Sequence, residues 1–173
     1  MPNLILIQNT YPDSGALLRV LNYALNTEMI GGYGLDPNRA YRQMSFIKNA
    51  YHKAEGTQLL HWILSFSTDE SYRLDMDEML AYGHWASQLF GPYQTAYGLH
   101  TDSHHFHIHF VTNTINFDTG LRYSDGRAAF WRIRNALQAE FPRSDVGIYV
   151  SFPLSSVNRY YEAEDKNEFL RIS

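Results

Sequence analysis

The chain has 173 residues, of which 45% are hydrophobic, 15% aromatic and 18% charged, a composition typical of a folded globular domain and not of a disordered segment. It contains no cysteine, so disulfides and thiolate metal sites are excluded, and any metal ligand must be His, Asp, Glu or a backbone oxygen. The formal net charge of −4 weighs against a nucleic-acid partner, because neutralising phosphates requires Lys and Arg.

The predicted elements alternate between strands and helices. In chain order we expect a strand at 3–8, a helix at 14–26 with Ser14 as its N-cap, a loop at 31–38, a helix at 38–56, a strand at 58–66, a helix at 71–91, strands at 93–100 and 106–117, a helix at 126–141 and a strand at 147–152. This order predicts an α+β fold, a single domain over 1–173 with helices packed on a mainly antiparallel sheet. No apolar run approaches the ~20 residues that cross a bilayer, and the N-terminus lacks a basic signal-peptide region, so we expect a cytoplasmic protein without a membrane partner.

Five of the eight histidines lie within ten residues, in the stretch YGLHTDSHHFHIHFVTNTIN. Because side chains alternate along a strand, His105, His107 and His109 share one face. The other face carries the residues expected to enter the core, Phe106, Ile108 and Phe110. A hairpin turn would bring His100, which ends the preceding strand, back alongside the three rings.

A divalent cation would offset the repulsion between such rings, since neutral imidazole is a good nitrogen donor. His107 and His109 are about 7 Å apart along the strand and can converge on one ion. The spacing therefore predicts a metal site, and zinc with three histidines is one ion that would fit it. Asp102 lies in the turn, where a carboxylate can orient a ring or accept a proton, whereas His104 points the other way and is expected on the turn surface.

The segment HTDSHHFHIHFVTNTIN resembles the third signature motif of plasmid mobilisation relaxases, which belong to the HUH endonuclease superfamily. The matching residues are His100, Asp102, His107, Ile108, His109 and Asn113. Upstream, LLHWILSFSTDE resembles the His-x-x-x-Ser-Phe strand of that family, with His61, Ser65 and Phe66 in place. RVLNYALN resembles the helix with the nucleophilic tyrosine, here Tyr23, and GLDPNRAYRQM falls where relatives carry a loop and a helix. The resemblance covers roughly residues 5–140.

The resemblance implies an enzyme that nicks one DNA strand at an origin of transfer, with accessory mobilisation proteins as further partners. Tyr23 would attack a phosphodiester and form a 5′-phosphotyrosine, with Asp102 accepting its proton. A divalent ion, Mg²⁺ or Mn²⁺, would polarise the scissile phosphate, and its implied ligands are His100, His107 and His109. The residues implied to be neighbours of this site are His61, His105 and Asn113.

The position of Tyr23 on its predicted helix supports this role. Leu17, Leu18, Leu21 and Leu25 cluster in one sector of the 14–26 helix, and Tyr23 falls nearly opposite them. The chain has 13 tyrosines, and two of them near the same region, Tyr11 and Tyr33, are alternatives for the nucleophile.

A local cluster of arginines predicts a contact with the DNA backbone, although a solvated helix face would look the same. The cluster consists of Arg122, Arg127, Arg132 and Arg134. Three other functions stay open: a rolling-circle replication initiator with the same chemistry, a metal-dependent hydrolase of small phosphoesters that uses water, and a non-catalytic relative that only binds DNA or metal.

Overall fold

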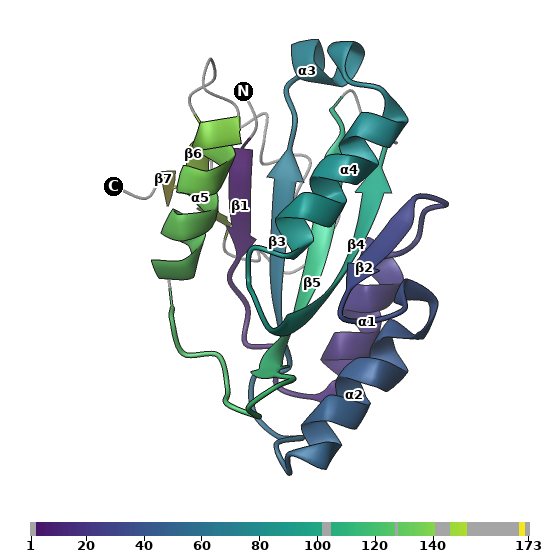
Figure 1. Ribbon diagram of the computed structural model, residues 1–173, viewed down its shortest axis with the longest axis vertical. Coiled ribbons are helices and arrows are strands. Elements are labelled where there is room, and N and C mark those ends of the chain that lie inside the picture. Colours follow the sequence, from purple (N-terminus) through teal and green to yellow (C-terminus); the bar gives the residue numbers. More distant parts are fainter. Residues whose placement is uncertain (1–2, 102–104, 127, 141–145, 152–169, 172–173) are drawn as a thin grey trace.

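The computed structural model describes residues 3–101, 105–126, 128–140, 146–151 and 170–171, so Asp102, His104 and Arg127 lie outside the described residues. The described strands form one seven-stranded sheet in the order β2-β4-β5-β3-β1-β6-β7 (Figure 1). Their bounds are β1 (Asn3–Ile7), β2 (Ile30–Tyr33), β3 (Leu59–Ser65), β4 (Tyr93–His100), β5 (His107–Asn116), β6 (Gly147–Ser151) and β7 (Leu170–Arg171). Among them β1 and β6 pair in parallel, and the other pairs are antiparallel. The prediction of an α+β fold on a mainly antiparallel sheet is confirmed.

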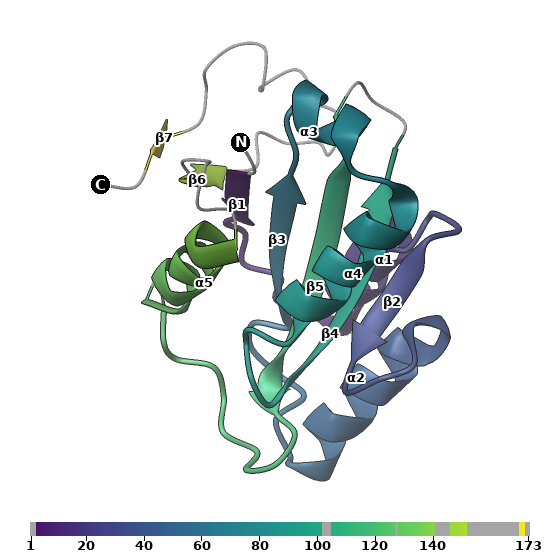
Figure 2. The same ribbon diagram turned by 45° about the horizontal axis from the view of Figure 1, so that its top comes forward.

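Helices cover both faces of the sheet. They are α1 (Ser14–Ala24), α2 (Ala40–Ala50), α3 (Thr68–Arg73), α4 (Met76–Ser87) and α5 (Ala128–Glu140), with a 3₁₀ turn at Pro37–Arg39. Because side chains alternate across a strand, β5 sends Val111 to the α1–α2 side and Phe110 to the α4–α5 side. Figure 2 shows α3 at the end of the sheet where β4 ends and β5 begins. None of the described helices is long and apolar enough to cross a membrane.

The larger core lies under α4 and α5 and is rich in aromatic side chains. Trp62 of β3 stacks on Phe110 of β5 with ring centroids 3.8 Å apart and nearly parallel planes. The indole nitrogen of Trp62 donates to Thr112 Oγ1 at 3.0 Å, so the buried polar group is satisfied. Offset aromatic stacking adds about 0.5–1.5 kcal/mol to the burial energy. This core fixes the register of β3 against β5 and thereby the positions of the histidines on the opposite face.

Several boundaries differ from the predicted ones. The N-cap of α1 is Asp13, whose carboxylate accepts from Ala16 N at 2.7 Å, and Ser14 is the first helical residue. Residues 30–33 of the predicted loop form β2, an edge strand that pairs with β4. The helix predicted at 38–56 is shorter, because α2 ends at Ala50 and His52 adopts a left-handed φ of 54°.

The predicted helix at 71–91 is two helices, because the segment has one N-cap residue directly before α3 and a second directly before α4. Ser67 and Asp75 each form a capping box with the glutamate three positions later, Glu70 and Glu78. Leu74 between the helices is extended, with ψ of 134°. A capping box satisfies two amide donors at a helix start, so the second box begins α4 as a separate helix.

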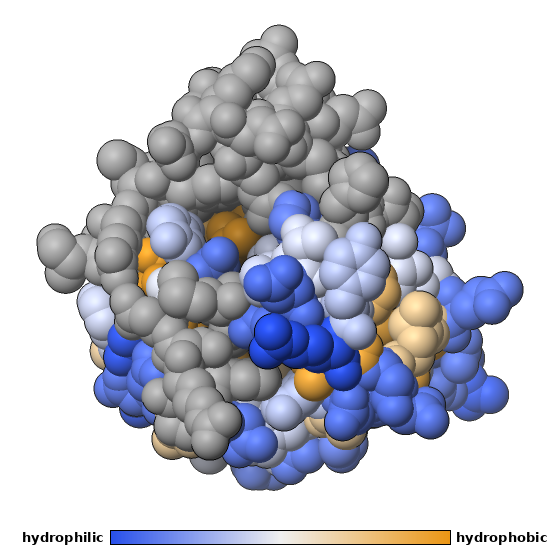
Figure 3. Space-filling model, turned by 90° about the horizontal axis from the view of Figure 1, so that it is seen from above, coloured by the Kyte–Doolittle hydropathy of each residue, from blue (hydrophilic) through white to orange (hydrophobic). Residues whose placement is uncertain are grey.

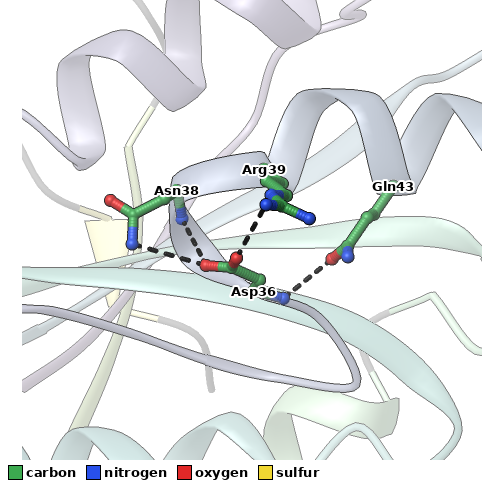
Figure 4. Close-up of polar contacts among 4 residues, drawn as sticks. All are labelled: Asp36, Asn38, Arg39 and Gln43. Atoms are coloured by element: carbon green, nitrogen blue, oxygen red, sulfur yellow. Dashed lines mark hydrogen bonds and ion pairs between the residues drawn. The ribbon is translucent and has the colours of Figure 1, made fainter.

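The connection into α2 is organised by one carboxylate. Asp36 accepts from the backbone nitrogen of Asn38 at 3.0 Å and lies 3.7 Å from the guanidinium of Arg39. Gln43 Oε1 in turn accepts from the backbone nitrogen of Asp36 at 2.7 Å (Figure 4). These exposed contacts form a turn in place of the helical start predicted at residue 38, so that α2 begins at Ala40.

Candidate active site

Three of the predicted ligands meet at the end of the sheet where β4 ends and β5 begins. His100 is the last residue of β4 and pairs directly with His107, the first residue of β5. His109 follows on the same face, and all three side chains are at least 93% buried. The ring centroids of His100 and His109 are 4.7 Å apart, and those of His107 and His109 are 6.5 Å apart. The fold therefore brings these three histidines side by side at this end of the sheet.

Tyr23 lies against two of these rings. Its ring centroid is 5.1 Å from that of His109 in an edge-on arrangement and 5.6 Å from that of His100. The expected geometry of α1 needs a correction, since the helix buries Ala16, Leu17, Leu21 and Ala24 while Leu18 is 41% exposed. The buried face is thus turned away from Leu18, and this rotation brings half-buried Tyr23 toward the sheet instead of away from it.

The last turn of α1 is bound to the end of β4. Nε2 of His100 lies 3.0 Å from the carbonyl oxygen of Ala24, and because a carbonyl only accepts, Nε2 donates this hydrogen bond. Gly98 makes this close approach possible, because a Cβ built there would lie 2.1 Å from the same oxygen. A histidine of the cluster and the residue after Tyr23 are thus joined by one hydrogen bond.

The other tyrosines considered from the sequence lie elsewhere. Tyr33 is on β2, opposite Thr95, and its ring faces Phe117 at 6.4 Å. Tyr11 is 94% buried, and this burial raises the pKa of its hydroxyl well above the ordinary value. Of the three candidates, Tyr23 is the one whose ring contacts His100 and His109.

His61 of β3 extends the cluster. Its Nε2 lies 3.2 Å from Nδ1 of His109, and its Nδ1 lies 3.5 Å from the hydroxyl of Tyr11. Burial, together with the nearby charge of His100, lowers the pKa of His61 to about 4. Burial, and then the charges of His61, His100 and His107, lower the pKa of His109 well below its ordinary value. Both imidazoles are therefore neutral at pH 7, the form that binds metals.

The donor set fits a metal ion, although the rings are not yet arranged as a complete site. Within the described residues, no three His, Asp or Glu side chains are placed so as to hold an ion as they stand. The ring-centre distances of 4.7 Å and 6.5 Å lie on either side of the roughly 5–6 Å that separates two imidazoles at about 2.1 Å from one ion. Ligating histidines usually donate their second N–H to a fixed acceptor, and His100 does so to Ala24 O.

Two predicted neighbours make separate contacts. His105 precedes β5 and so falls outside the strand alternation, with its Nδ1 3.1 Å from Thr68 Oγ1 and its ring 6.4 Å from that of His107. Asn113 lies four residues beyond His109 on the same face and is fully buried. Its amide donates to Met44 O, so it joins β5 to α2.

A buried lysine was missed in the sequence. Lys48 of α2 is 98% buried and donates through Nζ to Asn113 Oδ1 at 2.5 Å. Burial, together with the charge of Arg122, lowers the pKa of Lys48 to about 7. Its place in the helical pattern, four residues after Met44, is the signal that marks it as core-facing.

The described arginines of the predicted DNA-contact cluster already bind acceptors of their own chain. Arg122 donates to the carbonyls of Thr57, Lys53 and Glu55, at the end of β5 remote from the histidines. On α5, Arg132 pairs with Asp125 at 2.7 Å, and Nε of Arg134 donates to Val146 O at 3.0 Å. Because α5 covers the face opposite α1, the structure does not bring these arginines together with the histidines. Seen from above, at the end where α3 lies, the described surface is mainly hydrophilic with smaller apolar areas (Figure 3).

Comparisons with known proteins identify a family and a similar fold. The family model "Relaxase: MobA/VirD2-like, nuclease domain" matches residues 22–140. The chain is similar to Protein rlx of Staphylococcus aureus, with 29% identity over 110 residues, which is 63% of this chain and 34%, about a third, of that protein. Its fold is similar to that of the MobM relaxase domain bound to 26-nucleotide pMV158 oriT DNA, with a TM-score of 0.53 and 14% identity over 83% of this chain and 85% of that one. Since the matched segment includes Tyr23, the paired strands and the histidines, and spans more than half of the chain, this chain belongs to the MobA/VirD2-like relaxase nuclease domain family.

Proposed function

We propose that this domain nicks single-stranded DNA at an origin of transfer through Tyr23 and so serves the mobilisation of a plasmid or integrative element. Membership of the relaxase nuclease family supports the reaction class, and the MobM domain of similar fold was solved with oriT DNA. The observation that carries the choice of nucleophile is the contact of the Tyr23 ring with both His100 and His109. The proposed setting is the cytoplasm, with accessory mobilisation proteins as further partners.

The proposed step is a transesterification. The hydroxyl oxygen of Tyr23 bonds to phosphorus while the bond from phosphorus to the 3′ oxygen breaks. The phenolic proton passes to a base, and a proton reaches the departing 3′ oxygen, so the products are a 5′-phosphotyrosine and a 3′-hydroxyl. Because the ordinary pKa of tyrosine is about 10, the hydroxyl needs a proton acceptor. We assign that role to Asp102, two residues after His100 and outside the described residues.

The residues proposed to hold a divalent metal ion, Mg²⁺ or Mn²⁺, are His100, His107 and His109. When bound there, such an ion supplies Lewis acidity that neutralises charge on the non-bridging phosphate oxygens. The protein contributes neutral nitrogen donors in a buried setting, since the pKa of His109 is lowered by burial and by its histidine neighbours. It also orients the ring of His100 through Ala24, next to Tyr23.

The test is covalent capture of DNA. The protein is incubated with Mn²⁺ and a labelled random-sequence pool of single-stranded DNA, and adducts that survive denaturation are counted. We expect an adduct with the natural chain and with Tyr33→Phe, whose ring lies at the other end of β4, and none with Tyr23→Phe. An adduct that persists in Tyr23→Phe would show that another residue is the nucleophile. Release of cleaved DNA without any adduct would instead indicate a hydrolase that uses water.

A further inference from the structure

His61 contacts one of the two ring nitrogens of His109, a proposed metal ligand. Its Nε2 is 3.2 Å from Nδ1 of His109, within reach of an N–H···N hydrogen bond, and both rings are buried. The ring centroids are 5.5 Å apart and tilted by 32°. Since Nδ1 of His109 faces His61, the nitrogen through which His109 would bind an ion is Nε2, which is shielded from solvent.

Two tautomer arrangements are consistent with this contact. In the first, His109 donates from Nδ1 to Nε2 of His61, and the lone pair of His109 is on Nε2. In the second, His61 donates from Nε2, and the proton of His109 is on Nε2, where it blocks a metal ion. The first arrangement requires His61 to carry its proton on Nδ1, which faces the hydroxyl of Tyr11.

The contact between His61 and Tyr11 is compatible with the first arrangement. The distance from Nδ1 of His61 to the hydroxyl of Tyr11 is 3.5 Å, longer than the ~2.8 Å usual for a donating hydroxyl. At this distance the contact is weak whichever group donates, so the tautomer of His61 is set by its contact with His109. Tyr11 itself adopts a left-handed φ of 38°, which is unfavourable in a residue other than glycine. Its carbonyl accepts from Gln58 N at 2.9 Å, just before β3.

We propose that His61 is a positioning residue that accepts the Nδ1 proton of His109 and so keeps Nε2 of His109 available to a divalent ion. The proposal rests on the proposed function for the identity of His109 as a ligand. The fold places the two rings together because His61 is two residues along β3 from Ile63, the partner of His109, on the same face. Ligating histidines usually donate their second N–H in this way, and loss of that acceptor costs about 10–100-fold in metal affinity.

The test uses the whole chain, with Mn²⁺ as the probe. Two variants are compared, His61→Phe, which removes the acceptor, and His61→Gln, whose side-chain oxygen can accept the same proton. We expect His61→Phe to weaken Mn²⁺ binding by about 10–100-fold and His61→Gln to retain most of the affinity. Urea unfolding of each variant identifies any loss that comes from misfolding, and a simple structural role would weaken binding equally in both.

A second readout needs neither metal nor DNA. In ¹⁵N correlation spectra of the ring nitrogens of the metal-free natural chain, we expect His109 to be protonated on Nδ1, and we expect this preference to be lost in His61→Phe. A His109 protonated on Nε2 in the natural chain would overturn the proposal, as would unchanged Mn²⁺ affinity in folded His61→Phe. If these results are as expected but no DNA adduct forms, His61 keeps its assigned role and the nicking activity is refuted separately.

Discussion

Substitution of Gly98 by alanine should move Tyr23 on α1 away from the histidines of β4 and β5 without removing any side chain of the site. Gly98 lies on β4 opposite His109, directly under the last turn of α1. The added Cβ would lie 2.1 Å from Ala24 O and 3.0 Å from Thr27 Cγ2. Carbon atoms do not approach an oxygen so closely, so either α1 or β4 must move.

The size of the movement follows from the contact. Lengthening the 2.1 Å contact between the new Cβ and Ala24 O to an acceptable separation requires α1 and β4 to shift by about 1 Å relative to each other. This shift is enough to break or lengthen the hydrogen bond from His100 to Ala24. Tyr23 precedes Ala24 and moves with it. A misplacement of about 1 Å in a reacting group can cost about 100-fold in rate. Overpacking should also lower the free energy of unfolding by about 1–3 kcal/mol.

The assay measures the rate of covalent adduct formation on the single-stranded DNA pool with Mn²⁺, alongside urea unfolding. Gly91→Ala is the matched control, since its Cβ meets open space but its φ of 67° makes alanine unfavourable by about 1–2 kcal/mol. Both variants should lose similar stability, and Gly98→Ala alone should lose about 100-fold in adduct rate. Equal adduct rates in the two variants would refute the idea that the contact of α1 with β4 positions Tyr23.

Three further predictions concern stability, DNA and metal. Burial lowers the pKa of Lys48 to about 7 from 10.5, so the Lys48 amine binds its proton more tightly in the unfolded chain than in the native state. The resulting loss of native stability is complete below pH 7 and fades as the pH rises toward 10.5. Lys48→Met should therefore raise the free energy of unfolding at pH 6, measured by urea unfolding, by about 2 kcal/mol after loss of the bond to Asn113. The gain should vanish by pH 10. Arg122→Ala should lower the free energy of unfolding by about 2 kcal/mol, because its guanidinium holds three carbonyls, and a fall in DNA affinity without loss of stability would contradict this. Mn²⁺ should raise the melting temperature of the natural chain and not of His109→Ala, as measured by calorimetry at fixed ion concentration.

Sequence pattern was sufficient where a residue's role depends on its own strand. The alternation of histidines with apolar residues predicted β5 and its two faces, and Phe110 is fully buried while His107 and His109 lie on the opposite side. The pattern failed at β2, where two glycines are typical of a loop. Gly31 is needed because a Cβ there would lie 2.2 Å from the ring of Tyr97 on β4, a contact between segments 66 residues apart that local sequence cannot reveal.

The candidate site, too, could be predicted from the sequence only in part. The resemblance to the relaxase motif led to His100, His107 and His109, and the resemblance of the first helix led to Tyr23, whereas the links between them come from tertiary packing. The bond from His100 to Ala24 depends on how α1 docks on β4, and the contact of His61 with His109 depends on the register of β3 with β5. No periodicity in a single segment encodes either one.

The place of Tyr23 on its helix explains why those links matter. Tyr23 lies in the last turn of α1, and the helix ends at the next residue, so fewer backbone hydrogen bonds hold this turn than hold the middle of the helix. Its orientation is therefore set by neighbours outside the helix: the ring of His100 bonded to Ala24, and the hydroxyl of Thr27 bonded to Leu99 O at 2.8 Å. Both anchors end on β4, the strand that carries His100. A change that loosens α1 from β4 thus separates the proposed nucleophile from the proposed ligands, even when every one of those side chains is retained.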